Sequence, residues 1–286
     1  MLWATVESMA HLTLVNDSAY AHPMRHGVVA MVDALGFRGI WNRLADEKKE
    51  DEFIAAVRAL QEEAQVTARL WSPPSAPIGP VRAAGLSDTI VITIATAPAS
   101  GNRNIDATAL DFTIAVAVRL VKQIMRRATE APIGLAYRGC VTIGKCRVED
   151  SDRIVMGPAI DEAAELHQRA QGMFVWLTPE ALRAANAVQD GHTNGLEAGA
   201  VEWSVPLKLG DPYRTRVVSP FEADDDEKRR AALKESLLAT FEHGRDRLDV
   251  AIKRQQTEAF LDHAMGVGVR RPAPLPSGLG GPGDRS

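Results

Sequence analysis

The feature that most constrains this chain is a wholly apolar segment that ends on a carboxylate. Residues 28–32 read Val-Val-Ala-Met-Val, a run rich in β-branched side chains that predicts a buried strand, and Asp33 follows it. A carboxylate at the end of a buried strand is costly unless a partner compensates its charge, and a cation is the usual partner. Asp33 therefore either binds a cation or caps the helical pattern that begins after Gly36.

A second carboxylate is predicted at the tip of a hairpin. Residues 81–94 read as two strands that meet at Ser87 and Asp88. If strand 28–32 lies beside this hairpin, Asp33 and Asp88 reach the same end of the sheet. Two carboxylates that converge there form a site for one or two hard divalent cations.

Composition and charge exclude several other classes of protein. The chain has 286 residues, 45% of them hydrophobic, which suits one large domain or one domain with an appendage. Its formal charge of −4 and the lack of a long basic stripe argue against a nucleic-acid partner. No apolar run approaches the roughly 18 residues that span a bilayer, and the first residues lack the order of a signal peptide. We therefore expect a soluble, cytoplasmic protein without a membrane partner.

The two cysteines, Cys140 and Cys146, have no neighbouring cysteine or histidine in a metal-binding spacing. We expect reduced thiols in the core rather than a disulfide or a zinc site.

The order of the predicted elements indicates an α+β fold, in which a sheet is covered by helices. The pattern is β-α-ββ-α-β-α-β-α-ββ. The later elements are expected as a strand at 135–148 interrupted by Gly139 and Gly144, a helix at 158–171, a strand at 173–177, a helix at 179–187, and a hairpin of 201–207 with 213–218.

The chain divides into four parts by composition. We expect a loose leader at 1–25, a sheet domain at 26–220 and a disordered tail at 268–286, which is rich in Pro, Gly and Ser. Between the last two lies a charged segment at 224–265 with apolar residues at helical spacing. It predicts an amphipathic helix or helical pair that packs on the sheet domain or on a partner.

Three motifs in order resemble those of the class III nucleotidyl cyclases. Val-Asp-Ala-Leu-Gly-Phe at 32–37 is similar to the first metal-binding motif of that family, and Leu-Ser-Asp at 86–88 is similar to the second. Arg-Gly-Cys-Val-Thr-Ile-Gly at 138–144, followed by residues 157–166, resembles a third motif. The resemblance runs from about residue 27 to 218.

The resemblance implies a ferredoxin-like catalytic domain that works as a head-to-tail homodimer, with the active sites at the interface. It also implies that Asp33, Asp88 and the backbone of Ala34 bind two divalent ions, Mn²⁺ or Mg²⁺. The substrate's triphosphate would lie over Gly36, Phe37 and Arg38, where backbone amides precede a helix and favour anions. The reaction is an in-line displacement at phosphorus that forms a cyclic nucleotide and pyrophosphate.

The chain departs from the purine cyclases at the two residues that read the base. Ala84 and Ile154 stand where adenylyl cyclases carry Lys and Asp, and neither side chain can hydrogen-bond a base edge. Either the enzyme uses a triphosphate with another base, or the site is catalytically inactive. The intact metal pair favours another base, so the chain resembles most the pyrimidine cyclases of bacterial Pycsar antiviral defence. We expect UTP as substrate, with CTP next, and a separate effector for the cyclic product.

A second departure concerns the transition state. Asp161 and Glu165 stand where the purine cyclases carry Asn and Arg, and Glu165 cannot neutralise a phosphate. Arg169, one helical turn further on, either reaches over instead or forms an ordinary surface pair with Glu165. Lys208 lies where the family places a lysine that binds triphosphate, although a solvated lysine at a strand end is the simpler alternative.

Two rival functions stay open. The first is a purine cyclase that reads ATP or GTP through other contacts. The second is a catalytically silent cyclase-homology domain that binds nucleotide, or a partner through segment 224–265.

Overall fold

A computed structural model gives the structure of the chain. It describes residues 25–35, 44, 47–70, 78–96, 100–130, 134–148, 155–187, 196–197, 199–242 and 247–267. The predicted tail at 268–286 and, apart from Arg25, the predicted leader at 1–25 lie outside the described residues. So do Gly36, Phe37, Arg38 and Ile154 among the predicted site residues.

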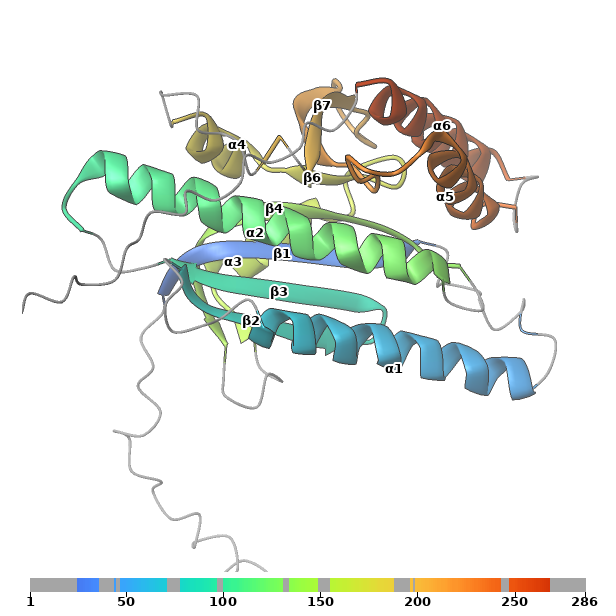
Figure 1. Cartoon of the computed structure of the whole chain (residues 1–286), viewed down its shortest axis with the longest axis horizontal. Coiled ribbons are helices and arrows are strands. Elements are labelled where there is room, and N and C mark those ends of the chain that lie inside the picture. Colours follow the sequence, from blue (N-terminus) through green and yellow to red (C-terminus); the bar gives the residue numbers. More distant parts are fainter. Residues whose placement is uncertain are drawn as a thin grey trace, which may run out of the picture.

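An eight-stranded mixed sheet forms the centre of the described structure (Figure 1). The strands run in the order β2-β3-β1-β4-β6-β8-β7, and β5 pairs with β4 outside this path. Their bounds are β1 Arg25–Leu35, β2 Ile78–Leu86, β3 Thr89–Thr96, β4 Ala136–Val148, β5 Val155–Met156, β6 Val175–Leu177, β7 Ala200–Val205 and β8 Tyr213–Val218. Only β4 and β6 pair in parallel among these strands. The predicted α+β fold is confirmed.

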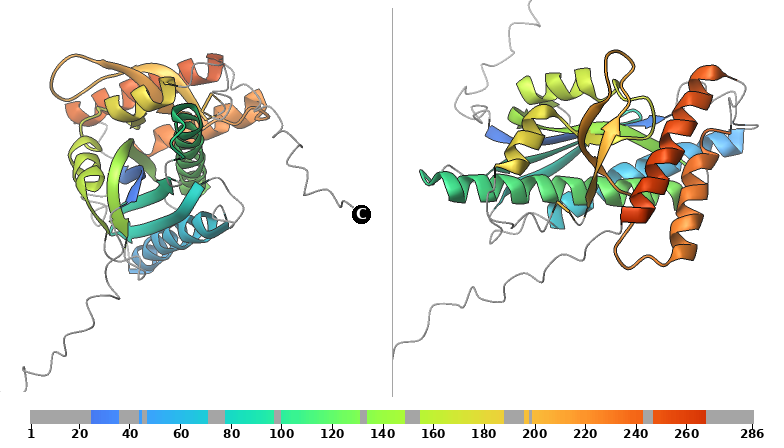
Figure 2. Two further views of the ribbon diagram at one scale, coloured as in Figure 1. Left: turned by 90° about the vertical axis from the view of Figure 1, so that its left-hand side faces the viewer. Right: turned by 90° about the horizontal axis from the view of Figure 1, so that it is seen from above.

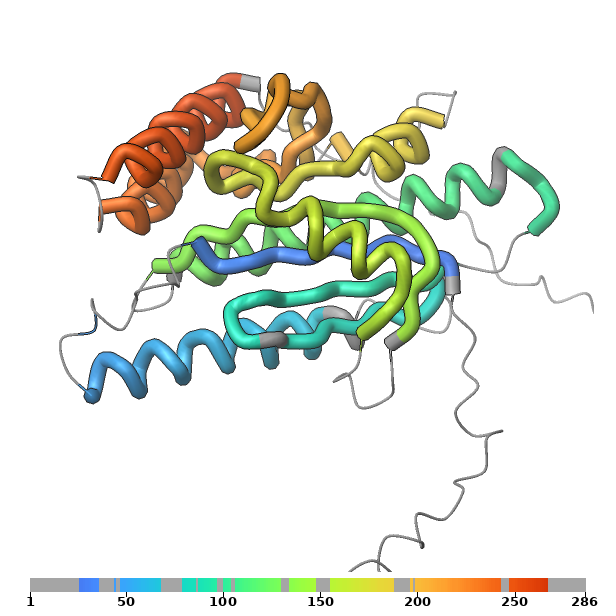
Figure 3. The backbone as a smooth tube through the Cα atoms, turned by 180° about the vertical axis from the view of Figure 1, so that it is seen from behind, coloured from blue at the N-terminus to red at the C-terminus, as the bar shows by residue number. Residues whose placement is uncertain are grey.

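Helices cover both faces of the sheet. Their bounds are α1 Glu47–Leu70, α2 Arg103–Glu130, α3 Pro158–Leu166, α4 Pro179–Asn186, α5 Glu227–Ala239 and α6 Leu248–Val267. In Figure 1, α2 lies in front of the central strands, and α1 lies at the edge of the sheet beside β2. Seen from behind, in Figure 3, α3 lies in front of β1 and β4.

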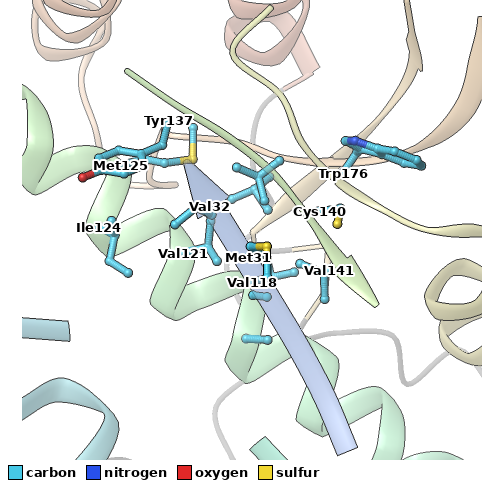
Figure 4. Close-up of a cluster of buried hydrophobic side chains, with 14 of the residues drawn as sticks. Met31, Val32, Val118, Val121, Ile124, Met125, Tyr137, Cys140, Val141 and Trp176 are labelled. Atoms are coloured by element: carbon cyan, nitrogen blue, oxygen red, sulfur yellow. The ribbon is translucent and has the colours of Figure 1, made fainter. Parts of the chain in front are cut away.

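Strand β1 is buried on both faces, which explains its unbroken apolar run. Val28, Ala30 and Val32 are fully buried on one face, and Val29 and Met31 are buried on the other. Figure 4 shows the side chains of Val118 and Val121 pointing from α2 toward β1. The central strand that carries Asp33 is thus fixed by packing on both sides.

The long strand predicted at 135–148 is confirmed as β4, and it continues through Gly139 and Gly144 without a break. Gly139 serves a close approach of two backbones instead. A Cβ at this position would lie 2.0 Å from the carbonyl oxygen of Met31 and 2.9 Å from Cα of Val32. Glycine therefore lets β4 pair tightly with β1.

Two further elements differ from the prediction. The helix expected at 158–171 ends at Leu166, because the following residues turn and Ala170 pairs with Leu207 as an isolated β-bridge. Strand β5 was not predicted, since two residues are too short for a periodic signal. Cys140 and Cys146 are free and buried, as expected. No helix in the described part of the chain is long and apolar enough to span a bilayer.

The charged C-terminal segment forms a helical pair, α5 and α6, that packs on the sheet domain (Figure 2, right). The connection is ionic as well as apolar. Asp225, just before α5, pairs with Arg126 of α2 at 2.6 Å, and Glu222 pairs with the buried Lys122 of α2 at 2.9 Å. Of the two arrangements predicted for this segment, the structure shows packing on the sheet domain.

Candidate active site

Asp33 lies within β1, opposite Thr89 of β3 and Arg138 of β4. Asp33 is only 9% exposed. The Thr89 hydroxyl donates a hydrogen bond to one carboxylate oxygen at 3.3 Å, and the Arg138 guanidinium donates to the other at 3.1 Å. Asp33 thus has partners on both neighbouring strands, and the Arg138 guanidinium compensates its charge.

Asp88 lies at the tip of the predicted hairpin, which the structure confirms. Ser87 and Asp88 form a two-residue turn, since Leu86 pairs directly with Thr89. Ser87 has φ of 60°, the left-handed backbone that such tight hairpin turns require. The Gln61 side chain of α1 donates a hydrogen bond to the Ser87 carbonyl at 2.7 Å, which ties the turn to the helix layer.

The structure brings the two carboxyl groups together. The Ala34 N–H donates a hydrogen bond to the Asp88 carbonyl oxygen at 3.2 Å. Burial raises the pKa of Asp88, and the negative charge of Asp33 together with a hydrogen bond between the two carboxyl groups raises that pKa further. The predicted meeting of Asp33 and Asp88 at one end of the sheet is therefore observed, while their role in metal binding stays a prediction.

The chemistry of these groups fits a divalent cation. Carboxylate and carbonyl oxygens are hard ligands of the kind that Mg²⁺ and Mn²⁺ take, and Mg²⁺ is commonly held by one or two carboxylates together with substrate phosphates. A cation between Asp33 and Asp88 would relieve the repulsion that raises the pKa of Asp88. Within the described residues no group of three or more acidic, histidine or cysteine side chains could hold a metal on its own. The backbone carbonyl of Ala34, the substrate and water are candidates for the remaining ligands.

Two basic residues lie near this pair. Burial lowers the pKa of Lys208, and the positive charges of Arg138 and Lys253 lower it further, while Asp33 opposes them. The charges of Asp33 and Arg138 therefore both act on the predicted Lys208. The Arg138 guanidinium is mostly buried, and its Nε is without a hydrogen-bond partner among the described residues. One end of the carboxylate pair is thus bordered by positive charge that an anionic substrate would meet.

Three residues of this site were not predicted. Arg138 begins the motif at 138–144, but no role was predicted for it. Its position opposite Asp33 follows only from the register of β1 and β4. Tyr137, the neighbour of Arg138 in β4, is fully buried, and burial first and then the charges of Asp88 and Asp33 raise its pKa, so its hydroxyl stays protonated. Gln61 gives no sequence signal, because a polar residue within a helix is usually solvated.

Helix α3 lies on the same sheet face as Asp33. Arg138, Cys140 and Thr142 alternate along β4 and so share one face, and both Cys140 and Thr142 hydrogen-bond to α3. Asp161 is exposed in the first turn of α3. Arg169 forms an ion pair with Glu165, the surface-pair alternative, and both side chains are more than half exposed.

Ala84, which was predicted to stand where adenylyl cyclases carry a base-reading lysine, is apolar and buried. Ala84 lies on β2 opposite Val91 and is 2% exposed. It offers no hydrogen bond to any base.

No protein-family profile and no curated protein sequence matches this chain. Several solved structures are similar to it. The adenylyl cyclase CyaB from P. aeruginosa is 14% identical over 71% of this chain and 98% of its own length, with a TM-score of 0.41. The guanylyl cyclase Cya2 is 14% identical over 69% and 93%, with a TM-score of 0.41. The catalytic core of a rhodopsin-guanylyl cyclase with converted specificity, in complex with ATPαS, is 13% identical over 68% and 95%, with a TM-score of 0.43. Similarity at this level does not assign an activity to this chain.

Proposed function

We propose that the protein is a class III nucleotidyl cyclase that converts a pyrimidine nucleoside triphosphate, UTP in the first place and CTP next, into its 3′,5′-cyclic monophosphate and pyrophosphate. One observation carries this proposal. Asp33 and Asp88, from motifs in the order of that family, meet beside Arg138 at one end of the sheet.

The residues of the site fit the demands of the reaction. The ribose 3′-oxygen forms a bond to the α-phosphorus, the bond from that phosphorus to the bridging oxygen breaks, pyrophosphate leaves and the hydroxyl proton is released. Asp33, Asp88 and the backbone of Ala34 would hold two divalent ions. Bound Mn²⁺ or Mg²⁺ would supply a lowered pKa for the attacking hydroxyl and neutralise charge on the leaving group. Arg138 and Lys208 would add fixed positive charge toward the phosphates.

The choice of a pyrimidine rests on what the chain lacks. A site that reads a purine by hydrogen bonds needs polar side chains at the base edge, and Ala84 supplies only a buried methyl group. Nothing in this position separates uracil from cytosine, so both triphosphates are candidates.

The assembly we propose is a homodimer with its active sites at the interface. Asp161 is exposed on α3, the helix on the sheet face that carries Asp33, and Arg169 is exposed just after that helix, so a second copy can reach both. The biological role we propose is a second-messenger synthase in antiphage defence, whose cyclic product is sensed by a separate effector.

A product assay tests the substrate directly. The purified chain is incubated separately with ATP, GTP, CTP and UTP in the presence of Mn²⁺, and the cyclic products are read by mass spectrometry. Cyclic UMP or cyclic CMP is the expected result. Cyclic AMP or cyclic GMP would reject the pyrimidine assignment and keep the cyclase.

One observation favours a silent binding module as the second candidate. Asp161 and Glu165 add negative charge near the proposed triphosphate site, and Arg169 is already paired with Glu165. No cyclic product from any of the four triphosphates, repeated in cells under phage challenge, would favour this candidate.

A further inference from the structure

A short segment, residues 169–174, connects two basic residues of the site. At one end, the Lys208 N–H donates to the Arg169 carbonyl at 2.8 Å, and the Gln171 N–H donates to the Pro206 carbonyl at 2.8 Å. At the other end, the Phe174 carbonyl accepts a hydrogen bond at 2.8 Å from the N–H of Gly139, the neighbour of Arg138 in β4. The position of this connecting segment therefore affects both Lys208 and Arg138.

The connecting segment is held in turn by α6. The buried Thr257 hydroxyl accepts a hydrogen bond from the Met173 N–H at 2.9 Å. The same hydroxyl donates to the Lys253 carbonyl, one turn earlier in α6, at 2.7 Å. Both roles of the hydroxyl are thus used, and one of them reaches outside its own helix.

Apolar packing supports the same contact. The rings of Phe174 and Phe260 meet edge to face with centroids 5.5 Å apart, and Phe260 also packs against Trp203. Gly172 has φ of 149°, and a Cβ there would lie 2.5 Å from the Phe174 ring and 3.0 Å from the Thr257 oxygen. Glycine therefore lets the segment approach α6 closely.

We propose that α6 is part of the catalytic unit, and that Thr257 is a positioning residue that sets Lys208 and Arg138 for the triphosphate of the substrate. This inference rests on the proposed function. Small displacements of groups that bind phosphate weaken binding strongly, and the Met173 N–H would lose its buried partner without the hydroxyl. The positive charge of Lys253 on α6 also lowers the pKa of Lys208, so the helix lies close to the site it would support.

Three variants of the full chain test the inference. Thr257→Val removes the hydroxyl at nearly constant volume, and Thr257→Ser keeps it. Thr113→Val is the matched control, because Thr113 is also fully buried and donates within its own helix, to Ala109 at 2.6 Å. Binding of inorganic tripolyphosphate in Mg²⁺ is measured by calorimetry, kcat and KM are measured with UTP and CTP, and thermal unfolding is recorded for each protein.

We expect Thr257→Val to bind tripolyphosphate about tenfold more weakly than the wild-type chain. Thr257→Ser should restore binding, and Thr113→Val should lower the melting temperature without changing binding. If Thr257→Val does not fold, Phe260→Leu replaces it, and a several-fold loss is expected there. A lower melting temperature with unchanged binding in Thr257→Val, or in Phe260→Leu in its place, would overturn the inference, and so would a wild-type chain that does not bind tripolyphosphate.

The outcome separates this inference from the proposed function. Loss of binding in Thr257→Val with no cyclic product from the wild-type chain would reject the cyclase and keep the positioning role. Cyclic product from the wild type together with unchanged binding in Thr257→Val would support the cyclase and reject the positioning role of Thr257.

Discussion

The Ala34 N–H donates a hydrogen bond to the Asp88 carbonyl oxygen, with 3.2 Å between the two atoms. This bond joins β1, just after Asp33, to the tip of the β2–β3 hairpin. It fixes the separation of two carboxyl groups that lie far apart in the sequence. The site is therefore built by strand pairing, and changes to that pairing should affect both stability and activity.

Arg138 is expected to stabilise the fold by neutralising Asp33. Both side chains are mostly buried, so Arg138→Gln leaves a buried carboxylate without its cation and should cost about 3 kcal/mol in the free energy of unfolding. Because a divalent cation can supply the missing charge, Mn²⁺ should raise the melting temperature of the variant more than that of the wild type.

The matched control is Arg183→Gln, which breaks an exposed pair with Glu180. It should change stability by less than about 1 kcal/mol and leave the Mn²⁺ response unaltered. Equal Mn²⁺ shifts in Arg138→Gln and the wild type would contradict the predicted cation site.

Gly139→Ala should prevent β4 from pairing with β1. The added Cβ would lie 2.0 Å from the Met31 carbonyl oxygen, which no side-chain rotation can relieve. We expect loss of several kcal/mol or of soluble protein. Gly266→Ala is the control, because no atom lies within 4 Å of its added Cβ and it lies in helix α6. It should be neutral or stabilise by about 0.5–1 kcal/mol in urea unfolding. Normal folding of Gly139→Ala would refute the close approach.

Much of the site was predictable from local sequence, because each carboxylate sits beside its own structural signal. Asp33 follows an apolar run, and Asp88 follows Ser87 at the break between two strands. Arg138 was missed because its proximity to Asp33 depends on the register of two strands distant in sequence. The helix predicted to reach residue 171 ends early for the same reason, since Ala170 pairs with Leu207.

The surface on which the C-terminal helices dock could not be predicted from the sequence either. The amphipathic pattern predicted helices, but which surface they cover depends on Thr257 and Asp225 meeting partners far along the chain. A charged residue such as Asp225 would ordinarily be assigned to solvent.

Asp111 should make the protein less stable as pH rises. Burial raises the pKa of Asp111 to about 6 from its usual 3.8, against the opposing charge of Arg216, and one carboxylate oxygen is without a hydrogen-bond partner among the described residues. Because the pKa of Asp111 is higher in the folded state than in the unfolded state, the folded state binds the proton more tightly. This contribution to stability is fully present below pH 3.8 and is lost as the pH rises through about 6.

Asp111→Asn should therefore raise the free energy of unfolding at pH 8 by about 2 kcal/mol relative to the wild type, with a smaller gain at pH 5. Urea unfolding at the two pH values measures both. Asp106→Asn is the control and should have the opposite effect, a loss of stability at pH 8. Hydrogen bonds from Ser100 lower the pKa of Asp106, so its ionised carboxylate favours the folded state. If Asp111→Asn is no more stable than the wild type at pH 8, the cost of burying the Asp111 carboxylate must be offset by other interactions, and the prediction is wrong.

The ion pair of Arg126 and Asp225 should hold the helical pair on the sheet domain. The Asp225 side chain is fully buried, and burial alone would raise its pKa, but hydrogen bonds from Arg126 and the Glu222 N–H lower that pKa overall. Asp225→Asn removes the charge from the buried side of this ion pair and should cost about 3–5 kcal/mol. Arg214→Gln, which breaks an exposed pair with Glu202, should cost less than about 1 kcal/mol. Similar losses in both variants, by thermal unfolding, would refute this role.

The most direct test of the central claim compares turnover in two Asp→Asn variants. Asp88→Asn removes one of the two converging carboxylates at nearly constant shape, and Asp51→Asn removes an exposed carboxylate on α1. With UTP and CTP in saturating Mn²⁺, we predict cyclic product from the wild type and from Asp51→Asn. Asp88→Asn should be slower by about 100-fold or more while melting at or above the wild-type temperature, because repulsion with Asp33 is relieved. Undiminished cyclic product from Asp88→Asn would contradict the assignment of this carboxylate pair as the active site.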